Sequence, residues 1–462
     1  MRDVLDVIAW VLAIYFAVYL ACTLAMLAMA GLITRRRRHE LLPSTLRRLM
    51  RAELAPLISI CVAAYNESAV IVQTARSMLA LDYPHVEVVI ANDGSTDTTL
   101  AALRAEFDLQ PSHRRPQAEL PHLPVREAYE PRAPLPLLVL DKQNGGRSDS
   151  LNAAIAYSRG ALVVVMDADE LLAHDTLVQA IRPFLAEPER TVAAGASLGV
   201  ANGCRAVRGR ILERLRPRRL LALYQAVEYE RSFRVSRVAT SSLRALPIIS
   251  GGFGIFRRDA LLAVHGYTSD TIGEDFDITL RIRRHYADRG VPHRIPQIPN
   301  VLCWTTVPDS RRVLRRQRMR WHRGLHQVLS QHRGMLFRRR YGSVGWFAIP
   351  WAWTYELLNP FVVVLATVIS VIWLVAGWMA WQALLIGLFI TWAGVVAPTL
   401  GSLLMTDYPG ESARGWRNLA AIVGTSFVEI PYQCLTLVYR LESVFRHRVE
   451  WGEMERSAQR QT

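Results

Sequence analysis

Two long stretches without a charged side chain constrain this chain more than any other feature. Residues 7–33 make up 27 positions, and residues 357–406 make up 50 positions, with no Asp, Glu, Lys or Arg. A helix of about 20 apolar residues is enough to cross the hydrocarbon core of a bilayer. The sequence therefore excludes a wholly water-soluble protein and predicts helices that enter a membrane at both ends of the chain.

The arginines at positions 35–38 follow the first apolar stretch directly. Because positive residues mark the cytoplasmic end of a span, we expect the N-terminus outside and the residues after the span in the cytosol. A cleaved signal peptide is the alternative, but its apolar core is about 7–15 residues long and precedes a small-residue cleavage site. The length of the stretch and its arginine end favour a permanent anchor.

The net charge admits two interpretations. The chain carries 55 Lys and Arg against 40 Asp and Glu, a balance of +15. Nucleic-acid binding would use such an excess, but lipid head groups and the positive-inside bias explain the arginines better, and no interleaved aromatic platform accompanies them. We therefore expect no nucleic-acid partner. The five cysteines form no CxxC pair, so a structural zinc site or a disulfide scaffold is not expected either.

Between the apolar stretches, short β-rich runs alternate with helical ones. Strands are expected at 57–63, 86–91, 137–140 and 162–166, with helices at 68–80 and 148–158. This alternation predicts an α/β domain, a mostly parallel sheet covered by helices, inserted between transmembrane helices. Residues 106–136 are rich in Pro, Arg and His without a period, and we expect a long surface loop there.

The second apolar stretch, 357–406, is too long for one crossing. As a single helix it would extend about 75 Å at 1.5 Å per residue, so we expect two crossings with a turn near Ala376 and Gly377. The next apolar segment, 418–439, is interrupted by Glu429 and is expected to be interfacial or re-entrant. The predicted parts of the chain are an anchor helix at 1–34, a basic linker at 35–53, a cytosolic domain at 54–334, interfacial and transmembrane helices at 335–440, and a cytosolic tail at 441–462.

Polar residues follow each of the first two predicted strands. The first set lies at 62–67 and includes Ala63, Tyr65 and Glu67, and the second lies at 92–97 and includes Asp93. In open α/β sheets, ligands bind beyond the carboxyl ends of the strands. Taken alone, an Asp-Gly-Ser sequence there is better explained as a turn with a helix cap. Together with the other polar motifs at strand ends, it favours a binding site.

Two acidic residues, Asp167 and Asp169, come directly after the fourth predicted strand. Carboxylate oxygens at a rigid strand end suit Mg²⁺ or Mn²⁺ holding a diphosphate. Lys142, the only lysine in the chain, follows the third strand, and the four residues between it and Arg147 include two adjacent glycines, Gly145 and Gly146. Glycines let a backbone approach a phosphate closely, and the two cations would neutralise it.

Two further motifs lie later in the cytosolic part. Glu274 and Asp275 are adjacent acids, and Asp275 would serve as a general base if it lies within hydrogen-bond reach of a hydroxyl. Gln317 and Arg320 are three residues apart on a predicted helix and would share a face, followed by Trp321, whose flat ring suits stacking on a sugar. Each alone is better explained by a helix-start acid or a solvated basic helix, and only together do they favour a site.

Taken together and in this order, the six motifs resemble those of the membrane-embedded family 2 glycosyltransferases. This family includes the cellulose, chitin, hyaluronan and poly-N-acetylglucosamine synthases, and the similarity runs from about residue 56 to residue 324. The resemblance implies a GT-A-type, Rossmann-like domain that transfers a sugar from a UDP-sugar with inversion, using Mg²⁺ or Mn²⁺. Two departures are Gly273, where the family usually has Thr, and Arg147, where close relatives have Lys.

The resemblance also assigns a role to each motif residue. Those implied for the nucleotide and the donor are Ala63, Tyr65, Glu67, Asp93, Lys142, Asp167, Gln317 and Arg320. Asp167 and Asp169 would hold the metal, Asp275 would be the general base beside Glu274, and Trp321 would floor the acceptor site. The tail residues 451–454 also resemble those of poly-N-acetylglucosamine synthases, and we lean towards UDP-N-acetylglucosamine as the donor.

The expected activity is extension of a β-linked polysaccharide, with export across the membrane as a further hypothesis. Transfer of one sugar to a lipid-linked acceptor is the alternative, whereas a sugar nucleotidyltransferase is disfavoured because its Gly-rich signature is missing near the N-terminus. The expected partners are a UDP-sugar, a saccharide or lipid-linked acceptor, the lipid bilayer and a small membrane subunit. The expected location is a bacterial inner (plasma) membrane, with several spans and a cytosolic catalytic domain.

Overall fold

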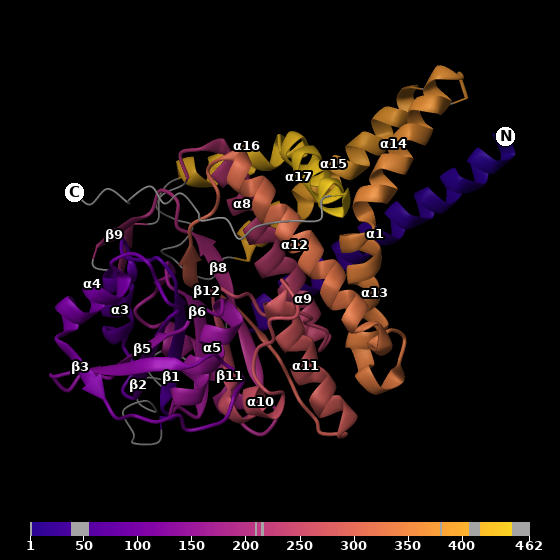
Figure 1. Ribbon diagram of the computed structural model, residues 1–462. Helices are drawn as coiled ribbons and strands as arrows, with labels where there is room; N and C mark the ends of the chain where they lie inside the picture. Colours follow the sequence, from indigo (N-terminus) through magenta and orange to yellow (C-terminus); the bar gives the residue numbers. More distant parts are fainter. Residues whose placement is uncertain are drawn as a thin grey trace.

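The computed structural model describes residues 2–37, 55–207, 210–213, 217–378, 381–405 and 416–445. A domain built on a sheet lies beside a group of long helices that project away from it (Figure 1). Most of the predicted linker at 35–53 and of the predicted tail at 441–462, including residues 451–454, lies outside the described residues.

A ten-stranded sheet forms the centre of the domain. Its strands, in spatial order, are β3 (Leu109–Ser112), β4 (Val125–Pro131), β5 (Leu137–Lys142), β2 (Val86–Asn92), β1 (Ile58–Ala64), β6 (Leu162–Asp167), β11 (Gly254–Arg257), β8 (Ala193–Val200), β12 (Gln297–Thr305) and β7 (Leu171–Leu172). Strands β5, β2, β1 and β6 are parallel, which confirms the four predicted strands. Because β11 is antiparallel to both β6 and β8, the whole sheet is mixed. A separate hairpin pairs β9 (Arg205–Val207) with β10 (Arg210–Glu213).

The prediction of a loop over 106–136 was wrong in part, because β3 and β4 lie within it. These two strands extend the β5 edge of the sheet in antiparallel register. Several of their side chains are exposed, so they lack the apolar pattern that reveals a strand in a sequence. Pro111 is tolerated because it lies in the outermost strand, where a missing backbone N–H breaks no ladder.

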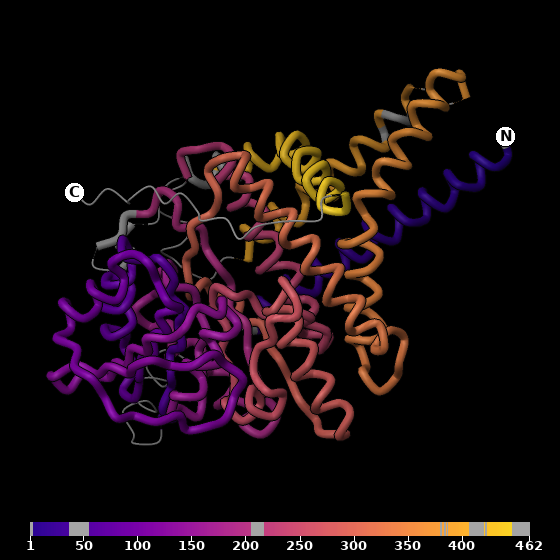
Figure 2. The backbone as a smooth tube through the Cα atoms, in the orientation of Figure 1, coloured from indigo at the N-terminus to yellow at the C-terminus, as the bar shows by residue number. Residues whose placement is uncertain are grey.

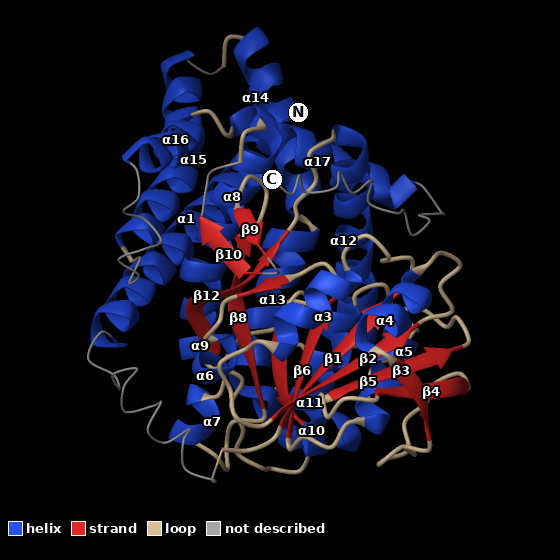
Figure 3. Ribbon diagram, turned by 90° about the vertical axis from the view of Figure 1, so that its left-hand side faces the viewer, coloured by secondary structure: helices blue, strands red, loops and turns tan. Residues whose placement is uncertain are grey.

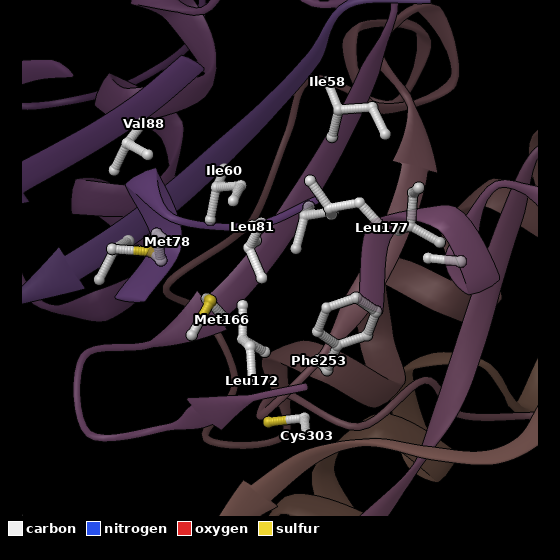
Figure 4. Close-up of a cluster of buried hydrophobic side chains, with 14 of the residues drawn as sticks. Ile58, Ile60, Met78, Leu81, Val88, Met166, Leu172, Leu177, Phe253 and Cys303 are labelled. Atoms are coloured by element: carbon white, nitrogen blue, oxygen red, sulfur yellow. The ribbon is translucent and has the colours of Figure 1, made fainter. Parts of the chain in front are cut away.

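Helices cover both faces of the sheet (Figure 3). They are α3 (Ile71–Leu79), α4 (Thr99–Phe107), α5 (Arg147–Tyr157), α6 (Thr176–Ala180), α7 (Arg182–Ala186), α10 (Arg258–Ala263) and α11 (Glu274–Asp288). The next helix, α12 (Arg311–Gln331), packs against α11. Ile60 of β1 belongs to the same buried cluster as Met78 of α3 (Figure 4). The next residue, Cys61, belongs to a second cluster with Leu151 of α5. The two-residue period of the strand thus buries both sides of β1, as a central strand requires.

The long apolar helices are α1 (Arg2–Arg37), α14 (Asn359–Val375) and α15 (Trp381–Leu404). The tube in Figure 2 shows α1 and the α14–α15 pair projecting on the same side of the molecule. By length and composition, Asp3–Arg36 and Gly387–Leu404 are candidate spans, and Val344–Leu357 with α14 is a third if this pair, bent by 49°, is one span. The chain turns at Ala376 and Gly377, as the sequence predicted, and Gly377 adopts a φ of 68° there.

A second set of helices lies between the sheet domain and these long helices. It comprises α8 (Leu220–Tyr229), the π-helical segment η1 (Glu230–Ser236), α9 (Arg237–Ser242), α16 (Trp416–Phe427) and α17 (Ile430–Phe445). Glu429, at the break between α16 and α17, is 1% exposed and forms an ion pair with Arg231 at 2.9 Å. The acid that interrupts the apolar segment therefore anchors it to η1. An interfacial or re-entrant position for residues 418–439 stays a prediction.

Candidate active site

The carboxyl ends of the parallel strands bring the predicted motifs to one edge of the sheet. Ala63 of β1 pairs with Ala91 of β2 on one side and with Asp167 of β6 on the other. Asn92 pairs in turn with Asp141, next to Lys142. Residues more than 100 positions apart in the sequence thus lie on adjacent strands, as expected for an open α/β sheet.

The loops after β1 and β2 are bound to each other. The side-chain Oδ1 of Asn66 accepts hydrogen bonds from the backbone of Thr96 at 2.9 Å and of Asp97 at 3.3 Å. The backbone N–H of Glu67 donates to Thr99 at 2.8 Å. Tyr65 remains 45% exposed beside these contacts. Asn66 and Asp97 were not among the predicted site residues, although Asn and Asp after a strand are typical of such loop-stabilising bonds.

Asp93 and Lys142 build the loop that precedes α5. Lys142 is fully buried and its Nζ lies 2.8 Å from Asp93 and 2.5 Å from Asp149. The Asp93 carboxylate also accepts from the backbone N–H of Gly145 at 2.9 Å and of Gly146 at 2.8 Å. Both residues therefore organise the glycine loop. The predicted contacts of Asp93 with uridine and of Lys142 with a diphosphate stay predictions.

Arg147, the first residue of α5, lies at the centre of the site. Its guanidinium contacts Asp167 at 2.7 Å, Glu274 at 2.5 Å and Asp275 at 3.2 Å, and donates to the carbonyl of Gly251 at 2.9 Å. Three predicted acids from two distant parts of the chain thus converge on one cation. The sequence indicated a cation here, but not that it would join the acidic motifs.

Two carboxyl groups of the site have unusual proton affinities. Burial raises the pKa of Asp275 to about 6, even though the neighbouring Arg147 opposes this change. Burial and the charge of Asp167 raise the pKa of Asp169 to about 6. Raised carboxyl pKa values are typical of groups that exchange protons or bind cations near neutral pH.

A divalent cation fits the Asp167 and Asp169 pair. The described residues contain no group of three or more His, Cys, Asp or Glu placed to hold a metal. Mg²⁺, however, is usually held by one or two carboxylates together with substrate phosphates and water, rather than by a complete protein cage. The Asp167 side chain is 41% exposed, so it is accessible to such a cation. Hard carboxylate oxygens suit Mg²⁺ or Mn²⁺.

Helix α12 carries Gln317, Arg320 and Trp321, and its Arg320 reaches the acidic cluster. The carboxylates of Asp167 and Glu274 interact electrostatically with Arg320, although burial still lowers its pKa. The Oε1 atom of Gln317 is buried and, within the described part of the chain, has no hydrogen-bond partner. Trp321 is 42% exposed. Arg320 therefore joins the acidic cluster, whereas the role of Trp321 as the floor of the acceptor site stays a prediction.

The close contact of Gly273 with α12 gives a physical reason for the glycine at this position, where the family usually has Thr. Gly273 precedes α11, and a Cβ atom there would lie 3.0 Å from the carbonyl oxygen of Gly324 in α12. A Cβ atom on Gly324 would in turn lie 2.9 Å from the backbone nitrogen of Gly273. The amide of Gln327 reinforces this contact by accepting from the backbone of Ile272 at 3.0 Å. The two glycines thus let the start of α11, with Glu274 and Asp275, pack directly against α12, which carries Arg320.

Gly324→Ala is expected to reduce the turnover number about tenfold with little effect on nucleotide affinity. The added methyl group would push the start of α11 away, and small displacements of a reacting group cost large factors in rate. The measurement is steady-state turnover alongside UDP binding. Gly334→Ala is the matched control because a Cβ atom there meets nothing within 4 Å. Equal activity of the two variants would contradict the prediction.

Comparisons with known proteins identify the family to which this sequence is similar. The family model described as "Glycosyl transferase family group 2" matches residues 162–393, and "Glycosyl transferase family 2" matches residues 59–119. The chain is 28% identical over 272 residues to a poly-beta-1,6-N-acetyl-D-glucosamine synthase of Staphylococcus epidermidis, covering 59% of this chain and 55% of that protein. The synthase of the same name from Staphylococcus aureus is also 28% identical, over 273 residues. The chain spans about half the length of these curated relatives.

A solved structure supports the fold. The mannosyltransferase PcManGT from Pyrobaculum calidifontis, determined in complex with GDP-Man and Mn²⁺, aligns with a TM-score of 0.53 and 19% sequence identity. The alignment covers 96% of this chain and 98% of that chain. The alignment therefore includes the helices that precede and follow the sheet domain in the sequence, as well as the sheet domain itself.

Proposed function

This chain belongs to glycosyl transferase family group 2, and from that premise we propose that it transfers a sugar from a UDP-sugar to a growing β-linked polysaccharide. The observation that carries the proposal is the convergence of Asp167, Glu274 and Asp275 on Arg147, with Arg320 interacting with the same carboxylates. The relatives are named for a polymer of N-acetylglucosamine, which supports UDP-N-acetylglucosamine as the donor.

The donor would bind across the carboxyl ends of β1, β2 and β6. The uridine would lie near Ala63, Tyr65, Glu67 and Asp93, and its diphosphate would lie between Asp167, Gln317 and Arg320. Asp167 and Asp169 would hold Mg²⁺ or Mn²⁺, which supplies positive charge to the departing diphosphate. Arg147 and Arg320 add fixed positive charge at the same place, where negative charge develops during transfer.

Asp275 would act as the general base. As the acceptor hydroxyl attacks, its oxygen forms a bond to the anomeric carbon of the sugar, its proton passes to the Asp275 carboxylate, and the bond from that carbon to the diphosphate breaks. The electron pair of the broken bond leaves with UDP. Attack opposite the leaving group inverts the anomeric centre. The raised pKa of Asp275 suits this role because a base accepts protons best when its pKa is near the working pH.

The membrane would provide the setting for chain growth. We propose that residues 54–334 form the cytosolic catalytic domain, that α1, α14 and α15 hold it at a bacterial plasma membrane, and that the lengthening chain leaves along these helices. The support is the apolar character of these helices and the position of α12 in the chain, where only residues 332–358 separate it from α14. A small membrane subunit as partner remains part of the proposal.

A panel of UDP-sugars tests the proposed function. The full chain in membranes, supplied with Mg²⁺ or Mn²⁺, is expected to release UDP fastest from UDP-N-acetylglucosamine and to stop when the metal is chelated. Mass analysis should detect a ladder of products. Products that carry a single sugar on a lipid would establish the alternative of one-step transfer. Absence of UDP release with every sugar nucleotide would overturn the proposal.

Activity is expected to decline in acid. With Asp275 as base, kcat/KM should fall about tenfold for each pH unit below about 6, because only the ionised carboxylate accepts the proton. The profile must be recorded at saturating Mn²⁺, since protons also compete with the metal at Asp169. A rate that stays constant down to pH 5 would exclude a base with this pKa.

A further inference from the structure

Arg318, between Gln317 and Arg320 in α12, belongs to a separate buried cluster. It is 3% exposed, and its guanidinium donates two hydrogen bonds to the carboxylate of Glu228, at 2.7 and 2.6 Å. The same group donates to the hydroxyl of Tyr432 at 2.8 Å, and that hydroxyl donates to Glu228 at 2.6 Å. The planar guanidinium is thus fixed by two partners from outside its own helix.

This cluster contacts the proposed acceptor site through Trp321. The carbon at the centre of the Arg318 guanidinium lies 4.6 Å from the centroid of the Trp321 ring. A cation placed over an indole face is attracted by its π-electrons and limits rotation of the ring. Trp321 nevertheless keeps 42% of its surface exposed. One part of the indole is therefore covered by a fixed cation, and another part remains open to a ligand.

The partners of Arg318 come from two different parts of the chain. Glu228 lies in α8, whereas Tyr432 lies in α17, near the C-terminal end of the described residues. Tyr432 is 2% exposed and stacks on Tyr224 of α8 with ring centroids 5.2 Å apart. Helix α17 lies against α12, and a second ion pair, Arg315 with Glu442 at 2.5 Å, joins them (Figure 1). The position of Arg318 thus depends on α17.

We propose that Arg318 is a positioning residue: held by Glu228 and Tyr432, it fixes the Trp321 ring in the orientation that receives the acceptor saccharide. This inference rests on the proposed function, because it takes Trp321 as the floor of the acceptor site. It gives α17 a role in acceptor binding. Arg318 itself is too deeply buried to contact the donor or the acceptor.

The first test removes one hydroxyl group. Tyr432→Phe keeps the ring that stacks on Tyr224 but loses the bonds to Arg318 and Glu228. The expected result is a rise of about tenfold in KM for a β-1,6-linked N-acetylglucosamine pentasaccharide, because the loosened Trp321 ring must be ordered again when the acceptor binds. The energy of the lost hydrogen bond to a charged group limits the size of this cost. The affinity for UDP should stay within about twofold. Tyr439→Phe makes the same change in the same helix and the same buried cluster, and is the matched control.

A double-mutant cycle tests whether Arg318 acts through Trp321. Arg318→Lys loses the bidentate hydrogen bonding to the Glu228 carboxylate, and Trp321→Ala removes the indole. If Arg318 only positions the indole, the double variant should have the acceptor KM of Trp321→Ala alone. Additive effects in an active enzyme would overturn this inference and leave the proposed function intact. A parallel loss of UDP affinity in Tyr432→Phe would also overturn it, by showing a general structural defect. Failure of the wild-type chain to transfer from any UDP-sugar would overturn the proposed function and this inference with it.

Discussion

Asp275→Asn is expected to reduce sugar transfer by about 10²- to 10⁴-fold, the range usually lost with a general base. Asparagine has nearly the same shape as aspartate but cannot take up the acceptor proton at neutral pH. The contact of Asp275 with Arg147 at 3.2 Å would be replaced by an uncharged one, while Asp167 and Glu274 would still hold Arg147. UDP binding should therefore change little. Rates of UDP release and UDP affinity, measured side by side, separate the two effects.

Asp270→Asn is the matched control for this substitution. Asp270 is exposed, lies five residues before Asp275 and undergoes the same change of charge. The transfer rate of the Asp270→Asn variant should equal that of the wild type. If Asp275→Asn also retained its turnover, or if it lost UDP affinity as strongly as turnover, Asp275 would not be the base and Glu274 would become the candidate.

The strand-end part of the site could be predicted because its signal is local. An apolar strand such as β6 ends in Asp167, and β2 ends just before Asp93, so the sequence itself shows where each strand stops. The parallel order of the strands then brings these ends together. The same reasoning failed for β3 and β4, because edge strands with exposed polar side chains have no comparable pattern.

The contacts between side chains could not be predicted. Lys142 and Arg147 have the same charge and flank the same glycines, yet Lys142 is buried in the loop whereas Arg147 lies among the acids. The path of the backbone determines which of the two cations is buried in the loop and which one meets the acids. The amino-acid sequence of the loop does not show that path. Likewise, Gly273 is recognisable as a site of close contact only once Gly324 is seen opposite it. Glu429 broke an apolar segment in the sequence, but its partner Arg231 lies almost 200 residues away.

Arg147→Gln is expected to lower transfer by about 100-fold, since one positive charge near a diphosphate in a partly buried site is worth a few kcal/mol. Two other quantities, the affinity for Mn²⁺ and the pH of the acid limb, should both increase. Without the donor, affinity for Mn²⁺ should rise, because Arg147 no longer competes for the Asp167 carboxylate. The acid limb of the pH profile should move to higher pH by roughly one pH unit, because Arg147 opposes the rise in the pKa of Asp275.

These three changes distinguish a counter-ion of the site from a residue that merely supports the fold. General damage to the domain would weaken transfer, metal binding and UDP binding together, whereas removal of a competing cation strengthens metal binding while transfer falls. Arg132→Gln is the control for the substitution itself, because Arg132 is 73% exposed and pairs with an exposed acid, Asp108, at 3.4 Å. Weaker Mn²⁺ binding by Arg147→Gln, with an unmoved acid limb, would mean that Arg147 does not hold the carboxylates in the working enzyme. The departure from lysine to arginine at this position would then have no bearing on the chemistry.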